Sequence, residues 1–166
     1  NREIDFETGD TILKAARNAG IEIPTLCFLE GRDPQGACRV CVVEIETQKT
    51  LAAACATPIN EGMKIQTNTK RIREARRTVV ELLLSEHEGN CQYCERSEDC
   101  ELKRLAYQLG IREIRYEGEK PDTWIDDSTP ALVRDQGKCI KCRRCVTACN
   151  IIQNVGALFP ELHFIV

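Results

Sequence analysis

The sequence predicts an α+β chain built from three small parts, each organised around its own group of cysteines. The chain has 166 residues, and its eleven cysteines fall into three groups separated by cysteine-free stretches. Alternation of polar and apolar residues, typical of β-strands, occurs before residue 68, and helical periodicity follows it. Aromatic residues make up only 5% of the chain. Metal binding is therefore expected to supply much of the folding free energy.

Composition argues against several classes of protein. A net charge of -3 disfavours nucleic-acid binding, which usually requires a basic face. No apolar run approaches the roughly 20 residues of a membrane span, and no secretion signal opens the chain. A reducing cytoplasm is the expected location. Cysteines in this number act there as metal ligands more often than as disulfides, and an odd number cannot all pair within one chain.

Residues 1–68 are predicted to form a small mixed sheet with one helix. Asp10 is expected to cap a helix over residues 11–19, and Gly20 to end it. A loop that contains glycines and prolines then carries the first cysteines. The predicted strands are residues 2–6, a hairpin of residues 42–47 with 51–54, and residues 63–67.

Residues 69–116 are predicted to be mainly helical. Residues 69–87 repeat apolar side chains at helical spacing, namely Ile72, Ala75, Val79, Leu82 and Leu83. A basic stripe follows the other side: Lys70, Arg71, Arg73, Arg76 and Arg77. A solvated helix face is favoured for this stripe over a docking site for an acidic partner. A second helix is expected over residues 98–109, with its leucines inward and Gly110 ending it.

Residues 117–130 are predicted to be a linker, because they contain two prolines and show no periodicity. Trp124 is expected either to anchor this linker to a neighbouring surface or to stand partly exposed without a function. Residues 131–166 contain the last group of cysteines and form the third part.

The third group of cysteines has the most telling spacing. Cys139, Cys142 and Cys145 are each two residues apart, and Cys149 follows after three. This run holds 4Fe–4S clusters in bacterial ferredoxins, where the fourth cysteine ligates the other cluster of a pair. The fourth ligand of the first cluster, and the remaining ligands of a second cluster bound by Cys149, are therefore expected beyond Val166. A zinc site is the alternative, although structural zinc usually takes two cysteine pairs.

The first group is predicted to hold one 2Fe–2S cluster, and it consists of Cys27, Cys38, Cys41 and Cys55. Its close pair and distant fourth cysteine agree with plant-type ferredoxins. The first gap is longer than in those proteins, but closure entropy grows only slowly with loop length. A zinc ribbon is the alternative.

The second group supplies three thiolates, from Cys91, Cys94 and Cys100, and needs a fourth donor. His87 lies four residues before Cys91. A solvent-exposed histidine favoured by the helix dipole is the alternative, but the incomplete ligand set favours a metal-binding role. A neutral imidazole in place of a thiolate removes one negative charge and should raise the reduction potential of the cluster.

These three patterns, in this order, resemble the N-terminal part of the iron-only (FeFe) hydrogenase catalytic subunit of the NAD(P)-linked, electron-bifurcating type. They are also similar to the large iron–sulfur subunit of complex I-type NADH dehydrogenase and to NAD-dependent formate dehydrogenase. The match runs through residues 9–27, 36–45, 91–106 and 126–150. The final cysteine run and the residues after it look more like the hydrogenase branch.

The resemblance implies a β-grasp, plant-type ferredoxin domain over residues 1–68 and a helical 4Fe–4S domain with one histidine and three cysteine ligands over residues 69–116. It implies the first half of a bacterial ferredoxin-like domain over residues 131–166. Hydrogenases of this family continue with a second cysteine run and a large catalytic domain, and usually begin with an extra strand. The chain is therefore expected to be a portion of a larger subunit, or else an independently encoded small subunit.

The expected function is single-electron relay within an oxidoreductase, with one 2Fe–2S cluster, one His/Cys3 4Fe–4S cluster and one or two further 4Fe–4S clusters. The resemblance implies an NAD(P)H-oxidising flavin/iron–sulfur subunit as partner and a downstream hydrogenase or dehydrogenase domain, in a hetero-oligomer. No nucleotide fingerprint or nucleophile–base pair is present, so no catalytic centre is expected within these residues.

Two other classes of function remain open at this point. The first is a zinc-binding interaction module, and the second is a redox-sensing regulator, which the acidic balance disfavours. The basic residues between the ligands are expected either to offset the negative charge of the clusters or to be ordinary surface residues. They are Arg39, Lys141, Arg143 and Arg144.

Overall fold

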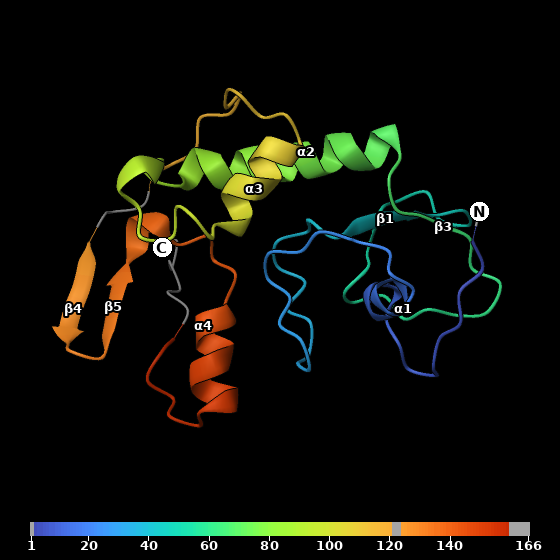
Figure 1. The fold of residues 1–166 in the computed structure, drawn as a ribbon, viewed down its shortest axis with the longest axis horizontal. Coiled ribbons are helices and arrows are strands. Elements are labelled where there is room, and N and C mark those ends of the chain that lie inside the picture. The colour runs from blue at the N-terminus through green and yellow to red at the C-terminus, as the bar shows by residue number, and fades with distance from the viewer. Residues whose placement is uncertain (1, 121–123, 160–166) are drawn as a thin grey trace, which may run out of the picture.

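The structure consists of short helices around two small antiparallel sheets. It is a computed structural model that describes residues 2–120 and 124–159. Figure 1 shows the longest helix, α2 (Lys70–Glu86), running across the top of the molecule, with the first sheet beneath one end. The second sheet lies beyond the other end of α2. This architecture confirms the expected mixture of helices and small sheets.

The first sheet has the strand order β2-β1-β3, and both pairings are antiparallel. Its central strand is β1 (Val42–Ile45), flanked by β2 (Ala52–Ala53) and β3 (Ile65–Gln66). Helix α1 (Ile12–Asn18) packs against the sheet through a buried apolar core. The predicted hairpin and third strand are therefore confirmed, in shorter form.

The strand expected over residues 2–6 is not formed. Ile4 still packs partly against the first core. Both edges of β1 are already paired, and the outer strands are each two residues long. A further strand would therefore find few backbone groups to pair with.

The residue that caps α1 is Thr11, not Asp10 as the sequence predicts. The Thr11 hydroxyl accepts a hydrogen bond from the Lys14 amide at 3.3 Å, which satisfies one free donor of the first turn. Asp10 instead accepts from the Glu7 amide at 3.1 Å and pairs with the Lys14 ammonium at 2.7 Å. The carboxylate therefore stabilises the turn that precedes the helix.

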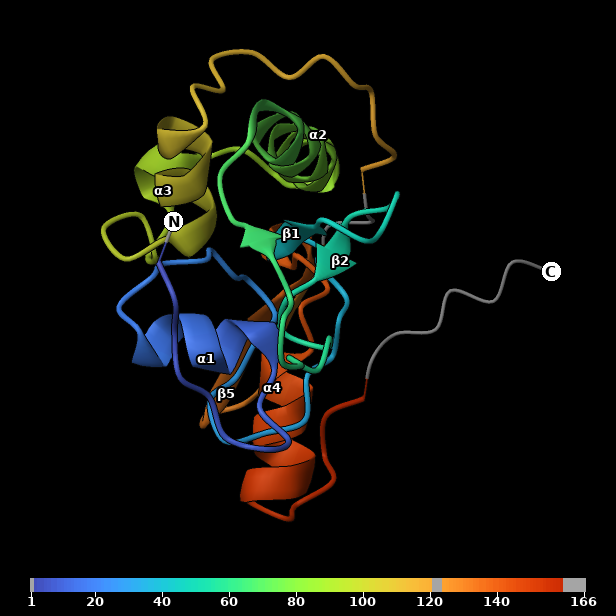
Figure 2. The ribbon, with the colours of Figure 1, turned by 90° about the vertical axis from the view of Figure 1, so that its right-hand side faces the viewer.

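Helix α2 is confirmed, but its buried face differs from the predicted one. Ile72 is buried as predicted, and Val80 is buried as well, whereas Leu82 is 46% exposed. Two members of the polar side, Arg76 and Glu81, are buried. Figure 2 shows the reason: α2 lies over β1 and β2 and also beside α3, so it is covered on two sides. The interpretation of the basic stripe as a solvated face is therefore wrong at Arg76.

Helix α3 (Glu101–Gln108) confirms the second predicted helix. Leu102 and Leu105 are buried, and Leu109 is half-buried against the same apolar cluster. Gly110 follows with a φ of +65°, a left-handed conformation that suits glycine after a helix.

The structure forms a hairpin where the sequence predicts a linker. Strand β4 (Ile125–Thr129) pairs with β5 (Leu132–Asp135). The Ser128 amide donates to the Asp126 carboxylate at 3.1 Å, which supports the turn despite the absence of an apolar alternation. Arg134 lies over the ring of Trp124 at 5.8 Å, so Trp124 contacts this hairpin and remains 42% exposed.

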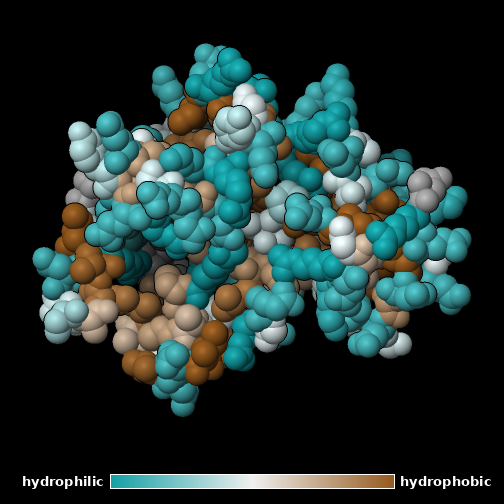
Figure 3. Space-filling view, viewed as in Figure 1, coloured by the Kyte–Doolittle hydropathy of each residue, from teal (hydrophilic) through white to brown (hydrophobic). Residues whose placement is uncertain are grey.

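Three short helical segments follow the hairpin: η2 (Gln136–Lys138), α4 (Arg144–Thr147) and the π-helical η3 (Ala148–Ile152). Apolar side chains gather on the surface over this region and the hairpin, at the lower left of Figure 3. None of the helices in the described part of the chain has the length and apolar character needed to traverse a lipid bilayer.

Candidate metal centres

The four cysteines of the first group are buried together at the end of the first sheet. Cys27 lies in the loop after α1, Cys38 and Cys41 precede β1, and Cys55 follows β2. Their exposed fractions are at most 8%. The β1–β2 ladder brings the last two together, because the Ala54 amide donates to the Cys41 carbonyl at 3.1 Å.

The four thiols form two hydrogen-bonded pairs, Cys27 with Cys38 and Cys41 with Cys55. The hydrogen bond from Cys38, helped by backbone amides, lowers the pKa of Cys27 to about 5. The hydrogen bond from Cys55 lowers the pKa of Cys41 to about 7. The same bonds, together with burial, raise the pKa of Cys38 and of Cys55.

This donor set has the chemistry that an iron–sulfur cluster requires. Thiolate is the form of cysteine that binds metal, and one thiol of each pair is already biased toward it. Charge interactions also connect the two pairs, since Cys27 acts on both Cys41 and Cys55. The four sulfurs therefore behave as one group, and they fit a cluster with four cysteine ligands.

The loop around this group turns at residues with left-handed backbone conformations. Gly36 has a φ of +59°, and Arg39, between Cys38 and Cys41, has a φ of +54°. Such a conformation is uncommon for a residue with a side chain. It lets the backbone curl around the thiols, so that the Ala37 and Val40 amides interact with the sulfurs of Cys27 and Cys38.

The second group lies between the end of α2 and the start of α3. His87 is the C-cap residue of α2, and its buried Nδ1 atom has no hydrogen-bond partner among the described residues. Burial lowers the pKa of His87, which favours the neutral imidazole that binds metals. An unpartnered buried nitrogen with a free lone pair fits the role of a ligand.

The three cysteines of the second group are more accessible than those of the first. Cys91 is exposed and belongs to the short helix η1 (Cys91–Tyr93), while Cys94 and Cys100 are half-buried. The Cys94 amide donates to the Cys91 carbonyl at 3.4 Å. Cys100 is the N-cap of α3, and its sulfur accepts from the Lys103 amide at 3.5 Å. The fold therefore places a helix N-terminus, which favours a thiolate, at one predicted ligand.

The third group lies on the turn that leads into α4 and on η3. Lys141 and Arg143, on either side of Cys142, have φ values of +53° and +61°. The Lys141 amide approaches the Cys139 sulfur at 3.4 Å. Cys142 is half-buried, and burial raises its pKa, although the Arg144 amide opposes that shift. Cys145 is exposed and Cys149 is half-buried.

One apolar cluster joins the three groups. Its members come from the loops of the first group, from α2 and α3, and from the turn of the third group. Cys27 and Cys38 belong to its buried core, while Cys100 and Cys142 pack against it. The structure therefore brings at least one predicted ligand of every group to the same place. In addition, the Lys141 ammonium pairs with Glu86, beside His87, at 2.9 Å.

All eleven cysteines are free thiols in the structure. In the described part of the chain, no three histidine, cysteine, aspartate or glutamate side chains are placed to hold a single metal ion. A single ion requires every ligand atom at about 2.0–2.3 Å. A cluster distributes its ligands over several iron atoms and so tolerates a wider arrangement.

Sequence patterns did not assign the roles of two polar residues near these groups. Arg76 is buried and donates to carbonyls on both sides of Cys41, and its only signal was its membership of a basic stripe. Arg144 was expected to be a charge-offsetting or surface residue. Its Nε atom donates to the Phe28 carbonyl, beside Cys27, at 3.1 Å, which links the third group to the first.

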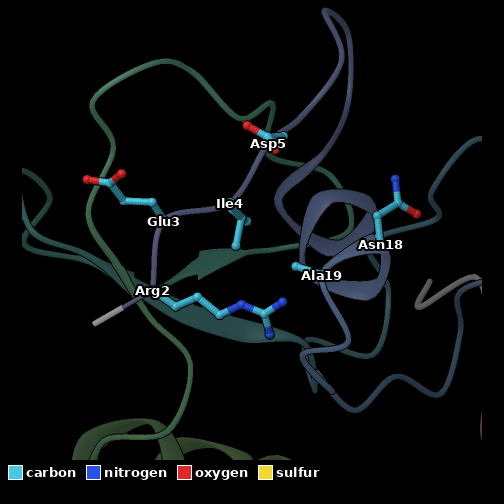
Figure 4. A pocket seen from close by; sticks show the side chains of 6 residues that line it. All are labelled: Arg2, Glu3, Ile4, Asp5, Asn18 and Ala19. Carbon is cyan, nitrogen blue, oxygen red and sulfur yellow. The ribbon is translucent and has the colours of Figure 1, made fainter.

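A pocket elsewhere in the molecule contains none of the predicted ligands. It lies beside α1 and is lined by Arg2, Glu3, Ile4, Asp5, Asn18 and Ala19. Figure 4 shows that this lining mixes charged side chains with small apolar ones. The cysteine groups therefore remain the candidate site.

Comparison with known families supports iron–sulfur binding. Residues 1–70 match the family described as a 2Fe-2S iron-sulfur cluster binding domain. Residues 76–115 match the NADH-ubiquinone oxidoreductase-G iron-sulfur binding region. The two matched ranges contain the whole first group and the whole second group of predicted ligands.

Relatives cover nearly the whole chain. The NADP-reducing hydrogenase subunit HndD of Solidesulfovibrio fructosivorans is 46% identical over 155 residues, which are 90% of this chain and 26% of that protein. The G 2 subunit of the NADH-quinone oxidoreductase of Rhizobium meliloti (strain 1021) is 36% identical over 159 residues, which are 95% of this chain and 19% of that protein. The chain thus spans about a quarter or less of the length of these relatives.

A solved structure has the same fold. It is the NAD+-reducing [NiFe]-hydrogenase in the H2-reduced state, with a TM-score of 0.89 and 36% identity over 95% of this chain and 66% of that chain. The resemblance predicted from the cysteine motifs is therefore confirmed. This chain corresponds to the iron–sulfur region of NAD(P)-linked hydrogenases and of the large iron–sulfur subunit of NADH-quinone oxidoreductases.

Proposed function

We propose, from the premise that this chain is such an iron–sulfur region, that it relays single electrons from an NAD(P)H-oxidising flavin/iron–sulfur subunit to a hydrogenase domain. The observation that carries the proposal is the common apolar cluster. It contains Cys27 and Cys38 of the first group and is contacted by Cys100 of the second and Cys142 of the third. Redox centres held by these residues would be neighbours in a water-excluding environment, as a relay requires.

The proposed ligands are those that the spacing predicts. Cys27, Cys38, Cys41 and Cys55 hold one 2Fe–2S cluster in a β-grasp domain over residues 1–68. His87, Cys91, Cys94 and Cys100 hold one 4Fe–4S cluster over residues 69–116. Cys139, Cys142 and Cys145 bind a further 4Fe–4S cluster in a partial bacterial-type domain over residues 131–166, and Cys149 ligates a second. When bound, each cluster takes up and releases one electron at a time.

The surrounding residues set the conditions for electron transfer. Backbone amides of the curled loops donate toward the sulfurs, which stabilises negative charge on a cluster. Leu26, Val40 and Leu102 exclude water from the space between the groups. Low water content reduces the solvent reorganisation that accompanies each transfer, because few mobile dipoles surround the charge.

The proposed setting is a hetero-oligomer in the cytoplasm. The hydrogenase assignment is preferred because the hydrogenase relative is 46% identical, against 36% for the quinone oxidoreductase relative. The same relay in an NADH dehydrogenase of the complex I type is the second candidate, and the match of residues 76–115 favours it.

Anaerobic purification of the chain tests the proposal. Iron, sulfide and zinc are measured together, and electron paramagnetic resonance spectra are recorded after stepwise reduction. The expected result is a coloured protein with iron and sulfide in equal amounts and signals from a 2Fe–2S and at least one 4Fe–4S cluster. A colourless protein that contains zinc would contradict the relay and support a zinc-binding interaction module.

A second measurement separates the two candidate settings. The full complex is isolated by a tag on this chain, and cluster reduction is followed with hydrogen or with NAD(P)H as the only reductant. Reduction by hydrogen supports the hydrogenase setting. Reduction by NADH alone, with electrons delivered to a quinone, supports the NADH dehydrogenase setting.

A further inference from the structure

Arg76 is a buried cation without a carboxylate partner. Its side chain is only 6% exposed, although it lies on the predominantly charged side of α2. No aspartate or glutamate in the described part of the chain forms an ion pair with it. A guanidinium carries its charge at every accessible pH, and burial of such a charge costs several kcal/mol unless other groups compensate it, roughly as for other ions in proteins.

The contacts of Arg76 are directed at one predicted ligand of the first group. Its Nε atom donates to the Val40 carbonyl at 3.1 Å, and its Nη2 atom donates to the Val42 carbonyl at 2.9 Å. These carbonyls stand on either side of Cys41, whose side chain is buried. The planar guanidinium therefore bridges the backbone around this ligand, which a single ammonium group could not do with the same geometry.

Two neutral carbonyls compensate the charge only in part. Burial lowers the pKa of Arg76, and the negative charge of the Cys41 thiolate acts in the opposite direction. The strongest negative charge available to Arg76 is therefore that of the first cysteine group. Because the surroundings are buried, this attraction is screened less than it would be at the surface.

We propose that Arg76 raises the reduction potential of the 2Fe–2S cluster held by the first group, and thereby sets the driving force of the first relay step. This inference rests on the proposed function. Reduction adds one electron and therefore one negative charge to the cluster, and a fixed buried cation beside a ligand stabilises that reduced state more than the oxidised one. Arg76 touches the backbone around a ligand, so it is a positioning and tuning residue.

The test compares three variants of the anaerobically loaded protein by redox titration monitored by electron paramagnetic resonance. R76Q removes the charge and keeps a side chain that can donate one hydrogen bond. R76K keeps the charge and loses the planar bridge. R73Q is the matched control, because Arg73 lies three residues earlier on the exposed side of α2 and binds only Asn68.

The expected result is at least a tenfold fall in the reduction equilibrium constant of the 2Fe–2S cluster in R76Q, which is 59 mV for a one-electron couple. R76K and R73Q should stay within threefold of the unsubstituted protein. The potential of the histidine-ligated cluster, measured in the same sample, should stay within threefold in all variants. A purely structural Arg76 would lower thermal stability without moving the potential of the 2Fe–2S cluster in this pattern.

The other outcomes are equally decisive. If R76Q loads its cluster and keeps an unchanged potential, the inference is wrong and the proposed relay stands. If R76Q does not take up iron, R76K decides: a retained potential supports the inference, and a tenfold fall overturns it. Failure of both variants to load would assign Arg76 a structural role only. Absence of a 2Fe–2S signal from the unsubstituted protein would overturn the inference and the proposed function together.

Discussion

Arg144 and Glu101 form a two-point ion pair that connects the second and third groups of predicted ligands. The Nη1 atom of Arg144 donates to Oε2 of Glu101, and its Nη2 atom donates to Oε1 at 3.5 Å. Arg144 directly precedes Cys145, and Glu101 directly follows Cys100. Since the same guanidinium also donates to the Phe28 carbonyl, it contacts the backbone or side chain next to a predicted ligand of all three groups.

This ion pair should contribute more to stability than the surface pairs of the molecule. Both side chains are about one-third exposed, and the two-point geometry limits the entropy lost on pairing. A double-mutant cycle with R144Q and E101Q should give a coupling of about 1 kcal/mol in chemical unfolding. The exposed pair Arg17–Glu30 is the control and should give less than about 0.5 kcal/mol. Equal couplings would show that Arg144 has no special linking role.

Substitution of Cys94 by alanine should remove the histidine-ligated cluster. A 4Fe–4S cluster needs four protein ligands, and the half-buried Cys94 is the middle cysteine of its group. Anaerobic iron and sulfide analysis should show the loss of one such cluster, and limited proteolysis should cut more readily between residues 85 and 110. The control is E95A at the neighbouring position. Unchanged iron content and protease resistance in C94A would remove Cys94 from the ligand set.

Substitution of His87 by cysteine should preserve the cluster and lower its potential. A thiolate in place of a neutral imidazole adds one negative charge to the ligand shell, which opposes the uptake of an electron. The reduction equilibrium constant should fall by roughly tenfold or more, and tenfold is about 59 mV. The measurement is a redox titration of the 4Fe–4S signal, with the 2Fe–2S signal as internal control. A potential that stays the same or rises would exclude His87 as a ligand.

The helices and the ligand groups could be read from the sequence because local rules govern them. Helix α2 follows apolar periodicity and a threonine cap, and the cysteine spacing reflects how a short turn wraps a cluster. The hairpin of β4 and β5 could not be read this way. Its strand Ile125–Thr129 is mostly exposed and polar, so no buried face imposes alternation on it.

Long-range contacts account for the remaining errors. Arg76 belongs to a basic stripe by sequence, and only the folded loop, more than thirty residues earlier, buries it. Leu82 fits the apolar repeat, yet α2 is covered on sides that leave Leu82 exposed. The meeting of the three ligand groups in one apolar cluster likewise depends on how α2 and α3 pack, and single-segment patterns do not contain that information.

Glu81 provides the last prediction, since it is a buried carboxylate held by two arginines. Its side chain is 0% exposed, and it accepts from Arg77 and Arg115 at 2.8 Å each. Burial alone would raise the pKa of Glu81, but these hydrogen bonds prevail and lower it below the usual value of 4.5. The carboxylate therefore ties α2 to the segment that follows α3.

The variant E81Q should be less stable by about 1–2 kcal/mol near pH 7, because the amide accepts more weakly while the half-exposed arginines regain some water. A lowered folded-state pKa stabilises the protein at pH values above the unfolded pKa, and this contribution disappears as the pH falls through the folded value. The difference in Tm between the two proteins should thus be constant from pH 8 to about pH 6 and shrink only below about pH 4.5. Thermal unfolding followed by circular dichroism checks this, with E74Q at an exposed position of the same helix as the control. A difference that grows on acidification, or one that E74Q reproduces, would show that the paired carboxylate of Glu81 does not stabilise the fold.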